Sequence, residues 1–73
     1  MADVTHWSNG GCPEDYGWVF DGTSITAFEI MEAAEDGWDG LYDLYIPEEI
    51  LDEAKASGME PSYFVDHLLQ TYR

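Results

Sequence analysis

Carboxylates are the side chains of this sequence that have the most chemistry to offer. Its 73 residues hold sixteen Asp and Glu against two Lys and Arg, a formal net charge of −14. Ten of the acids lie within residues 29–53, which contain no Lys or Arg: Glu29, Glu32, Glu35, Asp36, Asp39, Asp43, Glu48, Glu49, Asp52 and Glu53. Such a field repels nucleic acids and anionic membranes, attracts basic surfaces and destabilises a compact fold by self-repulsion. These acids therefore predict a basic partner, the alternative being a solvated face that serves solubility alone.

Catalytic and metal-binding roles have weaker support. Acid–base catalysis needs two carboxylates whose environments differ within a cleft, and the sequence marks out no such pair. Cys12 with His6 or His67 would supply a nucleophile and a base, but Cys12 lies beside Gly11 and Pro13 in an expected loop, which favours an incidental free thiol. The same three residues lack the paired spacing of a zinc site. We predict no enzyme, no metal and no cofactor.

Length and composition predict one small domain spanning residues 1–73. A hydrophobic fraction of 45% and eleven aromatic residues are enough for a core, so disorder is not expected despite the charge. No apolar run is long enough to span a membrane, and the first residues lack the features of a signal peptide. One cysteine is typical of a reducing compartment. We expect a cytoplasmic protein.

The elements that must position the acids begin with residues 1–15, predicted to be a loop or arm because of their Gly and Pro content. Residues 16–25 should form a hairpin, since Asp21-Gly22 between β-prone runs is typical of a type I′ turn. A helix is predicted over residues 26–36. Thr26 and Glu29 there have the spacing of a capping box.

The second half predicts one strand and two helices, which completes an α+β fold. Residues 41–46 alternate and lie between Gly40 and Pro47, so a strand is expected. Helices are predicted over residues 47–57 and 61–72. The last of these has an apolar stripe too wide for a lone small helix. Either a homodimer or the N-terminal hairpin would cover it.

Residues 41–73 resemble a ribbon-helix-helix domain. The matching features are the alternating "LYDLYI", the helix entry "IPEEILDEA", the link "GMEPS" and the apolar residues Val65, Leu68 and Leu69. In that family two chains pair strands into a ribbon that enters the DNA major groove. Here the outward positions would be Leu41, Asp43 and Tyr45, whereas base reading and phosphate contact require Arg, Lys, Asn or Gln. We therefore expect no direct nucleic-acid binding.

In size, acidity, single cysteine and lack of a catalytic motif, the chain resembles phage-encoded inhibitors of bacterial defence, notably anti-CRISPR proteins. The resemblance implies a non-enzymatic inhibitor acting in the bacterial host cytoplasm, whose carboxylates mimic phosphates for a CRISPR effector or another nuclease. Trp38, Tyr42 and Tyr45, which lie among the ten acids, would supply anchoring contacts. The alternative is a dimeric ribbon-helix-helix-like antitoxin or co-regulator that binds one basic protein.

Overall fold

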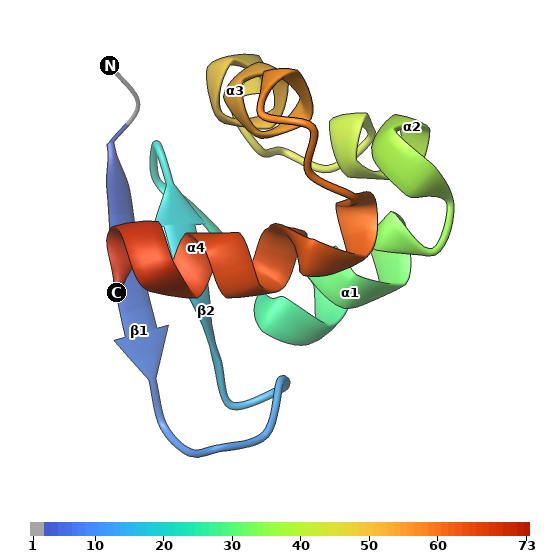
Figure 1. The fold of residues 1–73 in the computed structure, drawn as a ribbon. Coiled ribbons are helices and arrows are strands. Elements are labelled where there is room, and N and C mark those ends of the chain that lie inside the picture. The colour runs from blue at the N-terminus through green and yellow to red at the C-terminus, as the bar shows by residue number, and fades with distance from the viewer. Residues whose placement is uncertain (1–2) are drawn as a thin grey trace.

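Residues 3–73 are described by a computed structural model, and they form an α+β fold as predicted (Figure 1). A three-stranded antiparallel sheet of order β1-β2-β3 comes first, followed by the helices. The elements are β1 (Val4–Ser8), β2 (Tyr16–Phe20), β3 (Thr23–Thr26), α1 (Ala27–Ala34), α2 (Gly37–Tyr42), α3 (Glu48–Ala56), the 3₁₀ turn η1 (Pro61–Tyr63) and α4 (Phe64–Tyr72). Among residues 3–73, no helix combines the length and apolar character needed to cross a membrane.

The hairpin of β2 and β3 forms as predicted from its turn residues. Asp21 and Gly22 both have positive φ, 50° and 92°, the backbone that a type I′ turn requires. The register pairs Phe20 with Thr23 and Trp18 with Ile25. Trp18, Phe20 and Ile25 are buried. Because side chains alternate along a strand, these three lie on the face of the sheet that packs against the helices.

The start of α1 is fixed by the predicted capping box. The Thr26 hydroxyl accepts a hydrogen bond from the Glu29 amide at 3.1 Å, and the Glu29 carboxylate accepts one from the Thr26 amide at 3.3 Å. These bonds satisfy two backbone donors that a helix start leaves open. Glu29 is thereby held at the beginning of the helix, which orients the other acids of α1.

Replacing Thr26 by alanine should lower the free energy of unfolding by about 1 kcal/mol, because the Glu29 amide loses its acceptor. Thr26→Ser keeps the hydroxyl and should lose much less. Urea denaturation of the two variants measures the difference. Equal losses would show that the cap hydroxyl does not stabilise α1.

The core lies between the inner face of the sheet and the helices, and α4 crosses in front of β1 and β2 (Figure 1). Its fully buried large side chains come from the sheet and from every α-helix: Trp18, Phe20, Ile30, Leu41, Leu51, Phe64 and Leu68. Leu69 and Tyr72 pack against this core. The apolar stripe of α4 is therefore covered within the chain, where α4 packs against α1 and β1 rather than mainly against the predicted hairpin of residues 16–25.

The prediction of a loop over residues 1–15 is wrong for its first part. Val4–Ser8 form β1, which pairs antiparallel with β2 in a register that sets His6 opposite Trp18. The His6 ring lies 5.6 Å from that of Trp18 and 6.2 Å from that of Tyr16, edge-on or tilted. Pairing with β2 and these aromatic contacts outweigh the weak local signal of a strand that precedes a Gly-rich segment.

The predicted strand over residues 41–46 is also wrong. Leu41 and Tyr42 end α2, and the chain then turns before α3. Helical spacing lets Trp38, Leu41 and Tyr42 face the core together, which the alternation of a strand would not allow. Gly40 permits this packing, because a Cβ at that position would lie 2.2 Å from the Ala33 carbonyl oxygen. The ribbon strand of a ribbon-helix-helix domain is therefore missing from these residues.

Candidate functional site

All ten carboxylates of residues 29–53 are exposed. They lie on α1, α2, α3 and the turns between them, which together form the part of the molecule farther from β1 in Figure 1. Ten exposed acids on neighbouring elements give this part of the surface a dense negative field. The structure thus places nine of the sequence-predicted acids in two groups, one between α1 and α2 and one on α3, and Asp39 on α2 lies in neither group.

The first group lines a groove between α1 and α2 with a volume of about 480 Å³. We call it the acidic groove, and its carboxylates are Glu29, Glu32, Glu35, Asp36 and Asp43. Ala33, Gly40 and Leu44 also line it. An open groove lined by several carboxylates suits a cationic group, such as a lysine or arginine side chain of another protein.

The second group is the α3 row, formed by Glu48, Glu49, Asp52 and Glu53. Ile50, Leu51 and Ala54 are buried beneath it, so the helix buries one face and presents the acids on the other. Like charges four residues apart, as in Glu49 and Glu53, destabilise a helix by a few tenths of a kcal/mol. The row therefore costs stability, which is expected of residues retained for binding.

Tyr42 connects the end of α2 to the α3 row. Its hydroxyl donates a short hydrogen bond to the Asp52 carboxylate, and the ammonium of Lys55 lies 5.9 Å from the centre of its ring. The hydrogen bond to Asp52, with smaller effects of burial and of the charges on Asp52 and Glu48, raises the pKa of Tyr42 to about 12. This contact sets the position of Asp52 relative to α2.

Replacing Asp52 by alanine should return the pKa of Tyr42 toward 10, which tyrosine-ring NMR can follow during a pH titration. The raised pKa means that the folded state favours the protonated phenol. Its stabilising contribution should therefore be complete below pH 10 and disappear as the pH rises from 10 through 12. Glu48→Ala is the control and should change this pKa less. Identical titrations in wild type and Asp52→Ala would refute the hydrogen bond.

The three predicted aromatic anchors differ in exposure, and Tyr42 is half-buried with its hydroxyl hydrogen-bonded to Asp52. Tyr45 is 79% exposed and is available for contact. Trp38 is half-buried, and its ring meets that of Phe64 edge-on with centroids 6.1 Å apart. Trp38 therefore presents only part of its ring beside the acids and also belongs to the packing around the core.

Sequence reasoning missed several residues that shape this surface. Ala33, Gly40 and Leu44 line the acidic groove. If residues 37–42 are read as a helix, Gly40 is the signal that this helix packs closely against α1. Phe28 and Met31 on α1 are 41% and 46% exposed beside acidic neighbours. Their three-residue spacing places them on the same side of the helix, where they add apolar contact area to an acidic surface.

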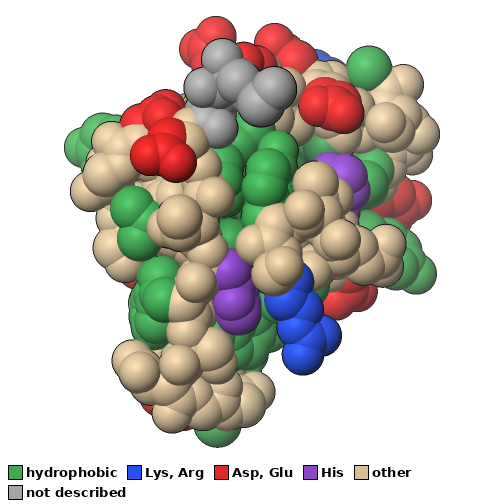
Figure 2. All heavy atoms as spheres, turned by 90° about the vertical axis from the view of Figure 1, so that its left-hand side faces the viewer, with side chains coloured by type: hydrophobic (Ala, Val, Ile, Leu, Met, Phe, Trp, Pro, Cys, Tyr) green, Lys and Arg blue, Asp and Glu red, His purple; other side chains and the backbone are tan. Residues whose placement is uncertain are grey.

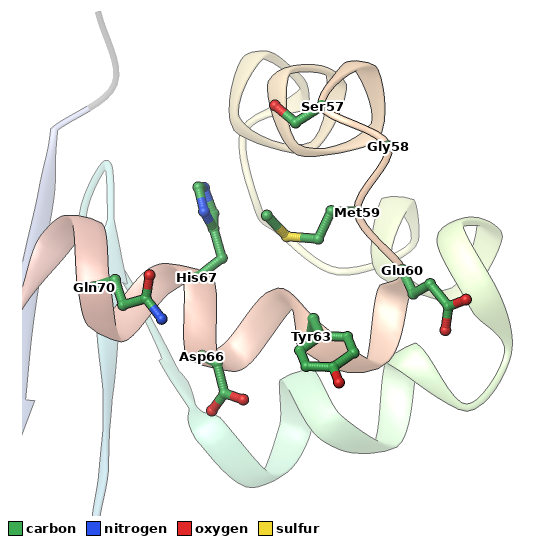
Figure 3. Close-up of a pocket in the computed structure, with 8 residues that line it drawn as sticks. All are labelled: Ser57, Gly58, Met59, Glu60, Tyr63, Asp66, His67 and Gln70. Carbon is green, nitrogen blue, oxygen red and sulfur yellow. The ribbon is translucent and has the colours of Figure 1, made fainter.

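Another hollow, of about 440 Å³, lies between the loop after α3 and the outer side of α4 (Figure 3). The His67 side chain points toward the loop that carries Met59, whereas Asp66 points to the other side of α4 and Glu60 points outward. These polar groups diverge rather than meet around one ligand position. Within residues 3–73, no three His, Cys, Asp or Glu side chains are placed to share a metal ion.

Comparison of the chain with protein-family models, with curated proteins and with solved structures found no match.

Proposed function

We propose that this chain is a non-enzymatic inhibitor that binds a basic, nucleic-acid-binding surface of another protein. The acidic groove and the α3 row take the places of phosphates in that complex. The observation that carries the proposal is the exposure of all ten carboxylates on consecutive elements of one small fold, five of them around one groove.

Helix geometry supports the substitution of carboxylates for phosphates. Residues four apart in a helix rise by about 6 Å along its axis, so Glu48 and Asp52, and Glu49 and Glu53, present charges at regular short intervals on α3. Opposite charge on the target would steer the encounter and make association fast and salt-sensitive. Tyr45, Phe28 and Met31 would then supply contacts from which water is excluded, and such contacts slow dissociation.

The target class follows from charge and from resemblance. A surface that holds nucleic acid carries Lys and Arg to neutralise its phosphates, and the chain is similar in character to phage-encoded inhibitors of bacterial defence. A CRISPR effector or another host nuclease in the bacterial cytoplasm is therefore the proposed target. The antitoxin or co-regulator alternative depended on a ribbon strand at residues 41–46, and no observation now favours it.

Capture from a bacterial lysate at low and at high salt, followed by mass spectrometry, tests the proposal. The expected result is a nucleic-acid-binding protein that is retained at low salt, released at high salt and displaced by added nucleic acid. Retention of a protein with no basic surface, or retention that salt does not weaken, would contradict phosphate mimicry.

A further inference from the structure

Strand β1 is an edge of the sheet, because it pairs only with β2. The bonded positions of this pair follow from two hydrogen bonds at its ends. The Asp21 amide donates to the Asp3 carbonyl at 2.9 Å, and the Asn9 amide donates to the Asp15 carbonyl at 2.6 Å. Bonded positions alternate in an antiparallel pair, so Thr5 and Trp7 also bond to β2.

The remaining backbone groups of β1 point away from the sheet. By this alternation they are the N–H and C=O groups of Val4, His6 and Ser8. Within residues 3–73, Val4, His6 and Ser8 take part in no backbone hydrogen bond outside the β1–β2 pairing. Their outward N–H and C=O groups are therefore free. A row of free donors and acceptors of this kind is a template for a further strand.

The residues of β1 do nothing to block such pairing. Edge strands are usually protected by charged side chains, proline or bulges, whereas "VTHWS" contains no Asp, Glu, Lys, Arg or Pro. Val4, His6 and Trp7 are half-buried, and Thr5 and Ser8 are exposed. The edge is therefore accessible and close to neutral in a chain of net charge −14.

The surface around β1 is also poor in acids. Figure 2 shows this side, where acidic side chains gather at the top and margins and the middle holds hydrophobic, histidine and basic ones. A hollow of about 230 Å³ beside β1 is lined by His6, Ser8, Gly10, Gly11, Tyr16, Leu69 and Arg73, with no Asp or Glu in its lining. Two copies of so acidic a chain repel each other least if they meet here.

We propose that β1 is a docking edge for a second copy of this chain, joined to it by antiparallel pairing of the two β1 strands. With His6 opposite His6 of the second copy, Val4 meets Ser8 and Ser8 meets Val4. The outward backbone groups of both strands then bond each other about a two-fold axis. Asp3 falls opposite Asn9 rather than opposite the other Asp3, so this register brings no two carboxylates together.

The dimer and the proposed target complex should respond to salt in opposite directions. The two copies carry the same net charge, so their long-range repulsion opposes pairing and is weakened as the Debye length falls. Salt should therefore strengthen the dimer, whereas it weakens binding to a basic target. The inference does not depend on the proposed function, because β1 lies apart from the acidic groove and the α3 row (Figure 1).

Sedimentation equilibrium of the purified chain at low and high salt tests the pairing. The average mass should rise from 8.3 kDa toward that of a dimer as salt and protein concentration increase. Ser8→Pro removes an outward N–H from each copy and should weaken the dimer about tenfold or more. Ser8→Ala keeps that N–H and should dimerise as the wild type does. Circular dichroism confirms that both variants keep the fold.

A second variant pair tests the same edge without altering the backbone. Thr5→Glu adds a carboxylate to β1, whereas Ser62→Glu adds one to the exposed side of η1, so both make the chain equally more acidic. Only Thr5→Glu should weaken the dimer strongly. A monomer at every salt and protein concentration would overturn the proposal. So would a dimer that salt dissociates, or one that neither Ser8→Pro nor Thr5→Glu weakens.

Discussion

Reversing two charges of the acidic groove, Glu32→Lys with Asp43→Lys, is expected to weaken binding to the target about a hundredfold and to abolish inhibition. The replacements turn attraction for a basic surface into repulsion on both sides of the groove. The loss should appear mainly as slower association, measured by surface plasmon resonance, because long-range charge steers the encounter. The thermal midpoint should not fall, since the variant has less self-repulsion.

Two matched variants show whether position or total charge matters. Glu14→Lys with Glu60→Lys reverses two exposed acids that do not line the groove. Each replacement of an acid by lysine raises the net charge by two, so the control pair and the groove pair both change the net charge from −14 to −10. Glu49→Lys with Glu53→Lys tests the α3 row separately. Equal losses for all three pairs would mean that only net charge counts, and no loss for the groove variant would exclude the groove as the contact.

Replacing Phe64 by alanine is expected to lower the free energy of unfolding by about 3–5 kcal/mol, the usual cost of removing a buried phenylalanine. Its side chain is fully buried, and its ring packs against Trp38 and His67. A chain of this length has a total stability of about 4–11 kcal/mol. The variant should therefore be partly unfolded at room temperature or close to it.

The neighbouring Tyr63 provides the control, because its side chain is 61% exposed. Tyr63→Ala should cost less than about 1 kcal/mol. Guanidinium denaturation followed by circular dichroism measures both variants. Similar midpoints for Phe64→Ala and Tyr63→Ala would mean that burial of Phe64 does not stabilise the core.

The elements that were predicted correctly are those with a strong local signal. Asp21 and Gly22 need positive φ at a turn, and Thr26 and Glu29 can satisfy helix donors whatever the rest of the chain does. The hairpin and the start of α1 therefore follow from neighbouring residues alone. The two C-terminal helices were recognisable in the same way from Pro47, Gly58 and their apolar spacing.

The predictions were wrong where contacts between residues far apart in the sequence determine the secondary structure. Trp38, Leu41 and Tyr42 fit a helical spacing, but Leu41 to Ile46 also fit an alternating one, and only packing of Gly40 against Ala33 distinguishes them. β1 has a modest strand signal of its own and is fixed by its pairing with β2. Neither contact can be inferred from local sequence.

For the candidate site, the sequence could supply the charges but not their geometry. The exposure of the ten acids follows from the cost of burying carboxylates. Their arrangement as a groove and a row depends on α2, whose last two residues, Leu41 and Tyr42, fall within the predicted strand. The sequence predicts Tyr42 as an anchoring aromatic among acids, but its hydrogen bond to Asp52 depends on the packing of α2 against α3.

Competition between this chain and nucleic acid for one target surface tests phosphate mimicry most directly. The captured target would be held at constant salt with a labelled nucleic-acid ligand, and fluorescence anisotropy would follow release of the ligand as the chain is added. Mimicry predicts mutually exclusive binding, full displacement by the wild type and a roughly hundredfold weaker effect of the groove variant. A stable ternary complex of target, nucleic acid and this chain would contradict it.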